Sequence, residues 1–589
     1  MHGIMRKSVA ERFGQGMTAR RAQRTQGPPE AQPQASAVTG IEKVAGEPTS
    51  KAAIRDIGKG FRWYDLPYLF LRSLQRSKVE PWIPARWRVK IREMSNFLFQ
   101  THHTRERRHG DDVYRYDQIE LPSGEGVTVP YASLVEYFTA SGVRELHKAI
   151  RRSGWNGARF LGMDPGGTET VTSSRRGDGR TWWRIAELTS RSAEYTSIDA
   201  QRAKLPAGVK SISLIGIPIG KGVTAVVAGF SLDESVSTRL NEQLQAPHQH
   251  EVIKRKGQMA VSQPPKAVLH YHTQRVRSEV HRELRRWMSR TLPGAFAHAR
   301  YPQPLFDVIF FNVADPAVDD GQPSRRDNDA LRAMGLREHL PYQVTSDELP
   351  GLLLQEPVTR DWSPDTSENV WSLWGNRDAA ARITSGTGHS GVESAGYFVG
   401  SRSTDFMSRW GLTALLRLLR SNASIAHDNA RELHGGTSSR DLKRLRIRTL
   451  TTSLDLATLE EDIKLYNRRR WRDREPVFYL DYTTWFKERD KEEGRKPFKP
   501  VNLNKQERKI QSRLARELVE FDAEYREVLS TVASLGASLD SRRVQRVAIW
   551  VSVVSVIVAL VTLWATQESP PDLVGLICSF LGTLGWGLC

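Results

Sequence analysis

The longest hydrophobic run in the sequence covers residues 547–566, which read VAIWVSVVSVIVALVTLWAT without a charged side chain. At about 1.5 Å of rise per residue, a helix of about 20 residues crosses the roughly 30 Å hydrocarbon core of a bilayer. Trp550 and Trp564 stand near its two ends, where interfacial aromatic side chains are common. The run predicts a transmembrane helix, because a long helix in a soluble core would keep a polar face.

A second hydrophobic segment covers residues 573–589, which read LVGLICSFLGTLGWGLC. With about 17 residues it reaches the lower limit for a span, so we expect a second transmembrane helix, with a re-entrant or interfacial segment as the alternative. The only two cysteines of the chain, Cys578 and Cys589, lie in this segment. Neither a disulfide framework nor a cysteine zinc site is therefore expected to organise the remainder of the chain.

The flanking charges predict the orientation of the first span. Arg542, Arg543 and Arg546 precede it, whereas the turn at 567–572 carries two acidic residues and no Lys or Arg. Cationic residues accumulate on the cytoplasmic side of membrane helices. We therefore expect a multi-pass protein of the cell membrane, inner or plasma, whose N-terminal mass is cytosolic.

Upstream of the first span, apolar residues repeat at alternating spacings of four and three, which is the heptad pattern of a coiled coil. The residues of this predicted oligomer seam are Leu514, Leu518, Phe521, Tyr525, Val528, Val532, Leu535 and Leu539. A parallel helix that associates with copies of itself would explain the pattern and would make the protein a homo-oligomer. The alternative is a helix that packs this stripe on its own domain.

The rest of the chain divides by pattern into three parts. Residues 1–50 are rich in Gln, Ala, Pro and Gly, which predicts a disordered basic segment. Residues 55–400 mix strand-like runs, such as SISLIGIPI and LFDVIFFNV, with helical stretches that include 132–151, and this predicts a cytosolic α/β or α+β domain. Helical periodicity from 404 onward predicts an all-helical stalk over 404–546.

The net charge of +19 is concentrated near the start of the chain, where residues 1–110 carry 21 Lys/Arg and 9 Asp/Glu. Within this region, residues 61–99 interleave cations with aromatic residues such as Trp63, Trp82 and Trp87. Most such aromatic residues belong to a core that Arg stems cover, and the alternative is base stacking in a nucleic-acid site. Anionic lipid and nucleic acid are both candidate partners of this region, besides the lipid bilayer itself.

Local motifs do not identify a catalytic, cofactor or metal site. Residues 216–222, GIPIGKG, differ in spacing from a phosphate-binding loop and lack its Ser or Thr after the Lys, so we expect a hairpin turn. His270, His272 and His281 lack the spacing of a helical metal site, and we expect solvated or hydrogen-bonded histidines. No serine-hydrolase elbow or kinase signature set is present, although an active site assembled from distant residues leaves no local pattern.

The order of an α/β domain, a helical stalk, a membrane helix continuing the stalk, a short turn and a second helix resembles the CorA-like family of pentameric divalent-cation channels. The resemblance covers about the last 190 residues and implies a cation channel. The Gly-Met-Asn motif of that family is replaced here by WATQES at 564–569, so no family site residue is transferred. The alternative is a membrane-anchored cytosolic binding or signalling module without transport activity.

Overall fold

The computed structural model describes most of the chain after residue 55. The chain divides into two units, Met1–Ala53 and Ile54–Cys589, and all of the described residues belong to the second. They are 56–60, 62–109, 118–155, 167–177, 181–193, 200–254, 258–316, 329–336, 341–357, 367–384, 391–433, 451–468, 475–566, 575 and 579. Within these, only the backbone is described for 403, 426, 427, 429–433, 528–544 and 564–566. The predicted disordered segment 1–50 and most of 573–589 lie outside the described residues.

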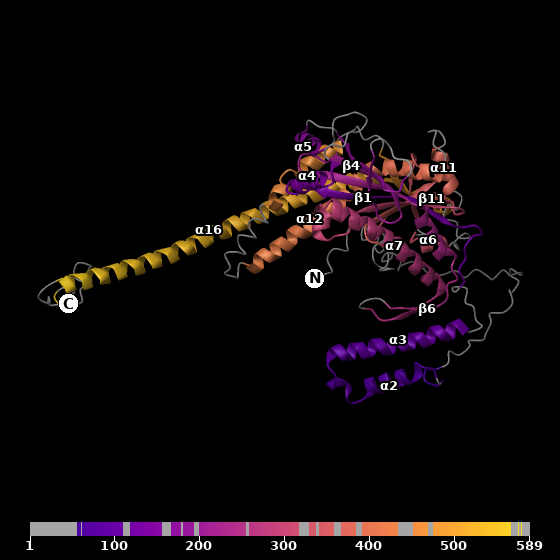
Figure 1. The fold of residues 1–589 in the computed structure, drawn as a ribbon, viewed down its shortest axis with the longest axis horizontal. Helices are drawn as coiled ribbons and strands as arrows, with labels where there is room; N and C mark the ends of the chain where they lie inside the picture. Colours follow the sequence, from indigo (N-terminus) through magenta and orange to yellow (C-terminus); the bar gives the residue numbers. More distant parts are fainter. Residues whose placement is uncertain are drawn as a thin grey trace, which may run out of the picture. The chain divides into compact units, whose positions relative to one another are not determined.

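Eleven of the described strands form one mixed sheet, in the order β13-β12-β9-β10-β11-β8-β1-β5-β4-β2-β3 (Figure 1). Its neighbouring strands are antiparallel except for the β8–β11 and β2–β3 pairs, which are parallel. The strands are β1 Val127–Phe138, β2 Trp183–Ser190, β3 Ala200–Ala203, β4 Val209–Pro218, β5 Thr224–Leu232, β8 Leu305–Phe311, β9 Tyr342–Ser346, β10 Leu352–Gln355, β11 Val370–Asn376, β12 Phe478–Tyr482 and β13 Val501–Asn502.

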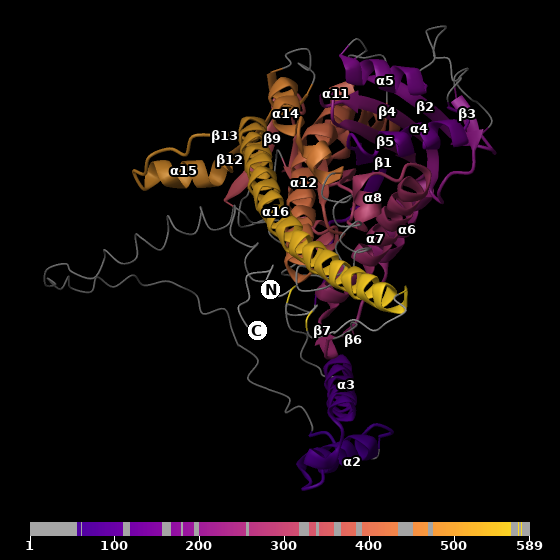
Figure 2. The ribbon, with the colours of Figure 1, turned by 90° about the vertical axis from the view of Figure 1, so that its left-hand side faces the viewer.

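Helices cover both faces of this sheet. The core of the first face includes residues of α4 Val143–Arg152, α5 Thr168–Arg176, α6 Glu234–Gln245, α7 Pro265–Thr291 and α10 Asp329–Ala333. The core of the second face includes residues of α8 Ala295–Ala299, α11 Arg377–Thr384, α12 Val392–Leu433, α14 Leu459–Arg468 and α16 Leu503–Thr566. Figure 2 shows α12 and α16 side by side. Successive residues of β1, such as Leu134 and Val135, point into the two different cores, as the pleat of a strand requires.

The remaining described elements are α2 Asp65–Arg76, the 3₁₀ helix η1 Glu80–Trp82, α3 Ala85–His109, the hairpin of β6 Glu251–Ile253 and β7 Val261–Gln263, and α15 Thr484–Glu492. Helices α2 and α3 pack on one another, and α3 also contacts the hairpin. Asn96 Nδ2 of α3 donates to the carbonyl of Ala260 at 2.6 Å, and Thr104 Oγ1 donates to Ser262 Oγ at 2.7 Å. These side chains fasten α3 to the hairpin.

Pro130 interrupts the regular pairing of β1. The register with β8 shifts between Thr128 and Tyr131, which enclose the proline. Proline has no N–H to donate to a neighbouring strand, and inside a sheet it is therefore accommodated at irregularities such as bulges. The irregularity leaves the β1–β5 pairing continuous from Tyr131 to Phe138.

The mixed α/β class expected from the sequence is confirmed, but two element predictions are wrong. Residues 132–138 extend β1 and are not the start of a helix. This strand is buried on both faces, so its sequence lacks the alternation that distinguishes a strand from a helix. The segment 404–546 is not all-helical, because β12 and β13 lie within it and β12 pairs with β9. The α/β fold thus extends well beyond residue 400.

Candidate functional site

A buried polar group on the second face is built around an ion pair between Arg409 and Glu475. Arg409 lies on α12 and Glu475 lies just before β12, and their side chains are 1% and 3% exposed. Arg409 Nε donates to Glu475 Oε2 at 2.7 Å. Burial alone would lower the pKa of Arg409, but the surrounding groups, led by the Glu475 carboxylate, together outweigh burial and hold that pKa above its usual value. Because cationic and amide N–H groups converge on Glu475, we assign its ionised form, although burial acts to raise its pKa.

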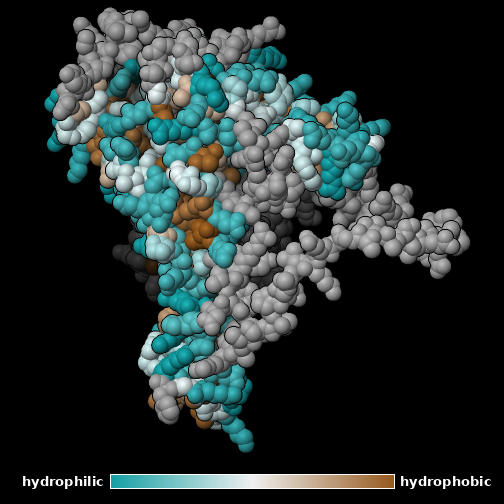
Figure 3. Space-filling model, turned by 90° about the vertical axis from the view of Figure 1, so that its right-hand side faces the viewer, coloured by the Kyte–Doolittle hydropathy of each residue, from teal (hydrophilic) through white to brown (hydrophobic). Residues whose placement is uncertain are grey.

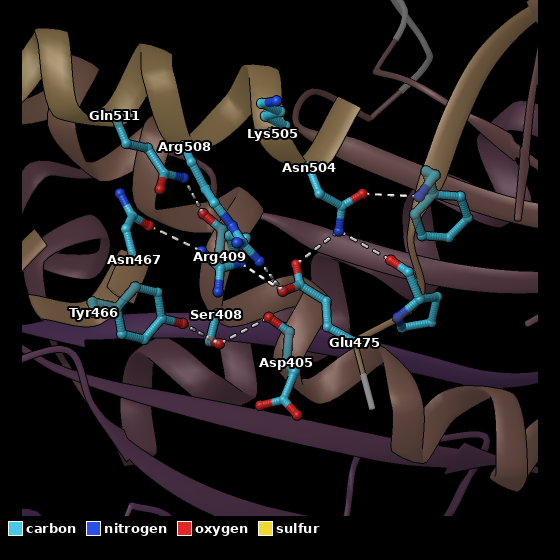
Figure 4. A network of polar contacts seen from close by, with 12 residues as sticks. Asp405, Ser408, Arg409, Tyr466, Asn467, Glu475, Asn504, Lys505, Arg508 and Gln511 are labelled. Carbon is cyan, nitrogen blue, oxygen red and sulfur yellow. Dashed lines mark hydrogen bonds and ion pairs between the residues drawn. The ribbon is translucent and has the colours of Figure 1, made fainter. Parts of the chain in front are cut away.

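Helix α14 contributes two further contacts to this arginine (Figure 4). Arg409 Nη1 donates to Asn467 Oδ1 at 3.0 Å, and the guanidinium lies 5.0 Å from the centre of the Tyr466 ring. The Tyr466 hydroxyl in turn lies 2.8 Å from Ser408 Oγ. The arginine therefore joins α12 both to α14 and to the segment that leads into β12.

Helix α16 closes the cluster from the other side (Figure 4). Asn504 Nδ2 donates to Glu475 Oε1 at 3.0 Å, and its Oδ1 accepts the Phe478 N–H at 2.9 Å. Two turns later, Gln511 Nε2 donates to the backbone carbonyl of Arg409 at 2.7 Å. We call the group of Arg409, Glu475, Asn467, Asn504 and Gln511 the helix junction. Three helices and one strand, distant in sequence, meet there.

The helix junction is built to hold α16 in place. Each of its side chains makes at least one hydrogen bond to another member or to a backbone group, and Gln511 and Arg409 are almost fully buried. Removing one partner of such a buried ion pair typically costs about 3–5 kcal/mol, because the other charge stays buried without compensation. The helix junction therefore has a structural role, because it fixes the start of α16 on the α/β domain.

A second buried ionic group lies on the opposite face, between α7, β8 and β11. Asp307 of β8 accepts from Nε and Nη2 of Arg277, both at 2.9 Å, and Arg277 Nη2 also donates to Ser372 Oγ. His281 Nε2 lies 3.1 Å from Asp307 Oδ2. Burial lowers the pKa of His281 to about 4, so the imidazole is neutral at pH 7, and the Arg277 charge helps to hold the pKa of Asp307 below its usual value against burial.

This group contains the residue types of a hydrolase site but not the access that catalysis needs. The adjoining cavity has a volume of about 10 Å³ and is lined mainly by apolar side chains, including Val129, Leu240 and Val280. Such a space accommodates a single water molecule. Substrate cannot reach the carboxylate in this conformation, so the group serves to fasten α7 to the sheet.

The glycine-rich turn at 216–222 is a hairpin, as its sequence predicted, and joins β4 to β5. Asp462 of α14 fills it: its carboxylate accepts the N–H of Lys221 at 2.8 Å and of Gly222 at 2.7 Å. A Cβ atom at Gly220 or Gly222 would collide with this side chain. The turn binds an anionic group, but the group belongs to the chain itself.

The predicted seam residues fall into two sets. Leu514 and Leu518 are buried in the core of the second face, and Tyr525 is also buried, so this part of the stripe packs within the chain. Phe521 is half-buried. The side chains of the other four, Val528, Val532, Leu535 and Leu539, lie outside the described residues. An oligomer seam at these four positions stays a prediction.

The other candidate residues are placed as follows. Arg546 is exposed at the start of the candidate span, and the side chains of Arg542 and Arg543 are not among those described. His270 Nδ1 lies 2.7 Å from the carbonyl of Arg332, and His272 Nε2 lies 3.1 Å from Glu251, as expected of hydrogen-bonded histidines. Within the part of the chain that the structure describes, no group of three or more His, Cys, Asp or Glu could hold a metal ion.

Sequence reasoning missed the helix junction, although one signal was present. Arg409 stands within the apolar run from Phe406 to Leu418, on a helix whose neighbouring positions are mostly buried. The run also contains Arg417, which is exposed, whereas Arg409 is buried. A buried arginine in such a run is expected to be paired, because an isolated buried charge is prohibitively costly. Its partner, Glu475, is 66 residues away and has no local signature.

Among the described residues, one helix is long and apolar enough to cross a membrane, at Gln545–Leu563 within α16. All of this stretch is exposed. No protein-family model matches the chain, and no curated protein or solved structure is significantly similar to it. Any functional conclusion therefore depends on the geometry of this chain.

Proposed function

We propose that this protein is a membrane-anchored α/β module whose domain is fixed to its own transmembrane helix. The observation that carries the proposal is the continuity of α16, which contains both Asn504 and Gln511 of the helix junction and the apolar stretch Gln545–Leu563. A continuous α-helix is stiff over this length, whereas a flexible linker would separate the domain from its anchor. The domain thus has a defined attachment to the span.

A bilayer is the environment that suits the apolar end of α16. Trp550 is 70% exposed, and Val547, Ile549 and Val551 are each about 60% exposed. Burying one such aliphatic side chain contributes roughly 1.5–3 kcal/mol, so leaving the whole stretch in water would cost tens of kcal/mol. The 19 residues of Gln545–Leu563 correspond to about 28 Å of helix, close to the thickness of the hydrocarbon core.

The orientation proposal follows from Arg542, Arg543 and Arg546. These cations precede the apolar stretch, so the positive-inside rule puts the α/β domain in the cytosol. The second segment, 573–589, would return the chain to the cytosolic side if it spans. We therefore propose a multi-pass protein of the cell membrane.

The test is extraction of membranes at alkaline pH followed by protease treatment. The full chain should stay in the membrane pellet, and protease added to right-side-out vesicles should leave the α/β domain intact. Release of the chain into the alkaline supernatant would contradict anchoring. Digestion of the domain from outside would contradict the orientation.

A second candidate function is cation conduction, and the same continuity favours it, because in the CorA-like architecture the stalk helix also continues into the first span. Conduction would need the predicted homo-oligomer, with Val528, Val532, Leu535 and Leu539 at its centre. Proteoliposomes that contain the full chain should then take up a divalent cation such as Mg²⁺. If correctly inserted protein passes no cation, conduction would be contradicted and the anchored module would stay as the proposed function.

A further inference from the structure

Helices α2 and α3 form a helical pair that buries only some of the aromatic side chains of this region. Tyr64, Tyr68 and Leu98 are buried between the helices. The sequence of this region predicts that its three tryptophans are core residues as well, and that prediction is wrong for all three. Trp63, Trp82 and Trp87 are 66%, 86% and 51% exposed. These large apolar side chains face away from the small core of the pair.

The outward face of α2 is apolar. Leu66, Leu69 and Phe70 are exposed and recur at spacings of three and four, which puts them on one side of the helix, while Tyr68 faces α3. Hydrophobic residues are visible at the lower end of the face shown in Figure 3, the end where Figure 1 labels α2. An apolar stripe of this kind on a soluble surface marks an interaction site.

The exposed face of α3 combines apolar and cationic residues. Trp87, Lys90 and Met94 are exposed at spacings of three and four, and Lys90 Nζ lies 5.2 Å from the centre of the Trp87 ring. Val89 is also 55% exposed. Long cationic side chains beside apolar ones can keep the charge in water while their stems contact apolar surface.

The charge of this region is strongly positive, because residues 56–109 contain twelve Lys or Arg and five Asp or Glu. The five acidic residues are all engaged: Asp65 accepts the backbone N–H groups of 58 and 62, and the other four contact cations. Those four are Asp56, Glu80, Glu93 and Glu106. Exposed cations such as Arg76, Lys78 and Arg86 therefore dominate the field outside the helical pair.

We propose that the outward surface of α2, η1 and α3 docks on an anionic bilayer surface. Its tryptophans and aliphatic residues would enter the boundary between headgroups and acyl chains, and its cations would contact the anionic headgroups, as in interfacial amphipathic helices. A nucleic acid would use flat rings for stacking, whereas much of this surface is Leu, Val and Met, which suit acyl chains. The inference rests on the proposed function and deepens it, because it adds a second membrane contact to the one made by the span.

The first experiment locates the surface with a fluorescent probe. In a full chain carrying Cys578→Ser and Cys589→Ser, an environment-sensitive fluorophore is attached through Trp82→Cys, and in a control chain through Tyr397→Cys, another exposed aromatic position on α12. Both chains are reconstituted into vesicles of phosphatidylcholine alone or with phosphatidylserine. Brominated acyl chains should quench the probe at 82 in anionic vesicles only, and should leave the probe at 397 unquenched in both.

The second experiment tests the charges. Lys78→Gln with Arg86→Gln removes two exposed cations, and each is expected to contribute about fivefold to docking, so the docking equilibrium should fall on the order of 25-fold. The matched control is Lys496→Gln with Lys499→Gln, which removes two exposed cations between α15 and β13. An equal loss in the control would show a net-charge effect and overturn the proposed surface.

The outcomes separate docking from anchoring. A probe that stays unquenched in anionic vesicles, in a chain that resists alkaline extraction, would overturn docking and leave anchoring in place. The chain can also be added to preformed anionic vesicles. If the probe is then quenched but alkaline extraction releases the chain, the result would support docking and contradict anchoring. A probe that responds to single-stranded RNA and not to anionic vesicles would make the surface a nucleic-acid site and overturn the proposal.

Discussion

The two ends of α16 are both rich in apolar residues, but in the part of the chain that the structure describes only the first end is covered. Leu503, Leu514, Ala515 and Leu518 are buried on the second face of the sheet, where α12 and α14 pack against them. The stretch Gln545–Leu563 has no such cover. One continuous helix therefore connects a region packed by protein with a region left exposed.

The difference lies in how the apolar residues are distributed around the helix. Near its start they form a stripe, and the opposite side carries Arg513, Arg516 and Glu517, because only one side meets the domain. Near its end no side is polar, which is the pattern of a helix surrounded by hydrocarbon. How the apolar residues are distributed around the helix axis, more than how many there are, indicates whether the helix packs on protein or lies in a bilayer.

The largest effect is expected from charging the exposed end. Val554→Lys with Ile557→Lys puts two cations near the middle of the apolar stretch, at a cost of about 2.5–3.5 kcal/mol each for membrane insertion. The chain should move from the membrane pellet to the alkaline supernatant, while circular dichroism shows an intact α/β domain. Val554→Leu with Ile557→Leu is the control and should stay in the pellet. A charged variant that remains in the pellet would show that this stretch is not needed to hold the chain in the membrane.

The second-largest effect is expected from charging the predicted oligomer seam, which lies between the two ends of α16. If Val528 and Val532 lie between subunits, Val528→Glu with Val532→Glu buries two carboxylates per chain without partners, at about 3–6 kcal/mol per subunit. Crosslinking in detergent should then show dissociation, while alkaline extraction shows that the chain stays in the membrane. Val528→Leu with Val532→Leu should keep the crosslinked species. An unchanged oligomer in the Glu variant would remove these two positions from the interface.

A variant of the helix junction tests whether its polar contacts attach the start of α16 to the domain, beyond what apolar packing does. Arg409→Met leaves the Glu475 carboxylate buried beside Asn504, and we expect a loss of about 3–5 kcal/mol in the free energy of unfolding, with earlier protease cleavage around the start of α16. The matched control is Arg420→Met on the same helix, because Arg420 pairs with Glu517 of α16 at 2.7 Å on the surface. That pair should contribute about 0–1 kcal/mol. Equal losses in the two variants would contradict the role of the junction.

The sequence predicted features that depend on local pattern. The α/β class, the strands β4 and β8, and the hairpin at 216–222 follow from runs of apolar residues and turn residues that a short window contains. The strand Phe478–Tyr482 was missed because its partner, β9, lies more than 130 residues earlier and pairing of this kind has no local signature. For the same reason, Arg409 could be identified as an unusual buried charge, but Glu475 could not be identified as its partner.

The heptad pattern shows the limit of periodicity. Leu514 and Leu518 obey the same spacing as Val528 and Val532, and yet the first two pack on α12 and α14 of their own chain. An apolar stripe along a helix indicates that the helix packs on an apolar neighbour. It does not indicate whether that neighbour belongs to the same chain. The exposed Trp63, Trp82 and Trp87 show the converse, because the aromatic composition of residues 61–99 predicted that they belong to a core, and the core between α2 and α3 is too small to hold them.

The α/β domain and the exposed end of α16 also differ in their response to pH, because residues 547–566 contain no acidic, basic or histidine side chain. The α/β domain, in contrast, buries Glu136 on β1. Its carboxylate accepts the N–H groups of Phe296 at 2.8 Å and Ala297 at 3.1 Å, and Nε2 of Gln303 at 3.2 Å. Burial outweighs these donors and raises the pKa of Glu136 to about 7. The pKa of His281 is shifted the other way, to about 4.

These two residues should change the stability of the domain in opposite directions. Between pH 4.5 and 7, the folded chain holds a proton on Glu136 that the unfolded chain has lost, so the free energy of unfolding falls as the pH rises. Between pH 4 and 6.5, the unfolded chain holds a proton on His281 that the folded chain lacks, so the free energy of unfolding rises with pH. Each contribution is about 3 kcal/mol, and the two largely cancel where they overlap.

Glu136→Gln and His281→Gln separate the two contributions, because each variant removes one titrating group. Relative to the parent chain, Glu136→Gln should gain about 3 kcal/mol of stability as the pH rises from 4.5 to 7, and His281→Gln should lose about as much from pH 4 to 6.5. Urea unfolding of the full chain in detergent, followed by circular dichroism, measures both slopes. Retention in the membrane pellet after alkaline extraction should be the same for both variants, because neither residue lies near the span in sequence. Parallel pH profiles for the parent and both variants would show that neither group titrates as its burial implies, and these two residues would then not explain a pH response of the α/β domain.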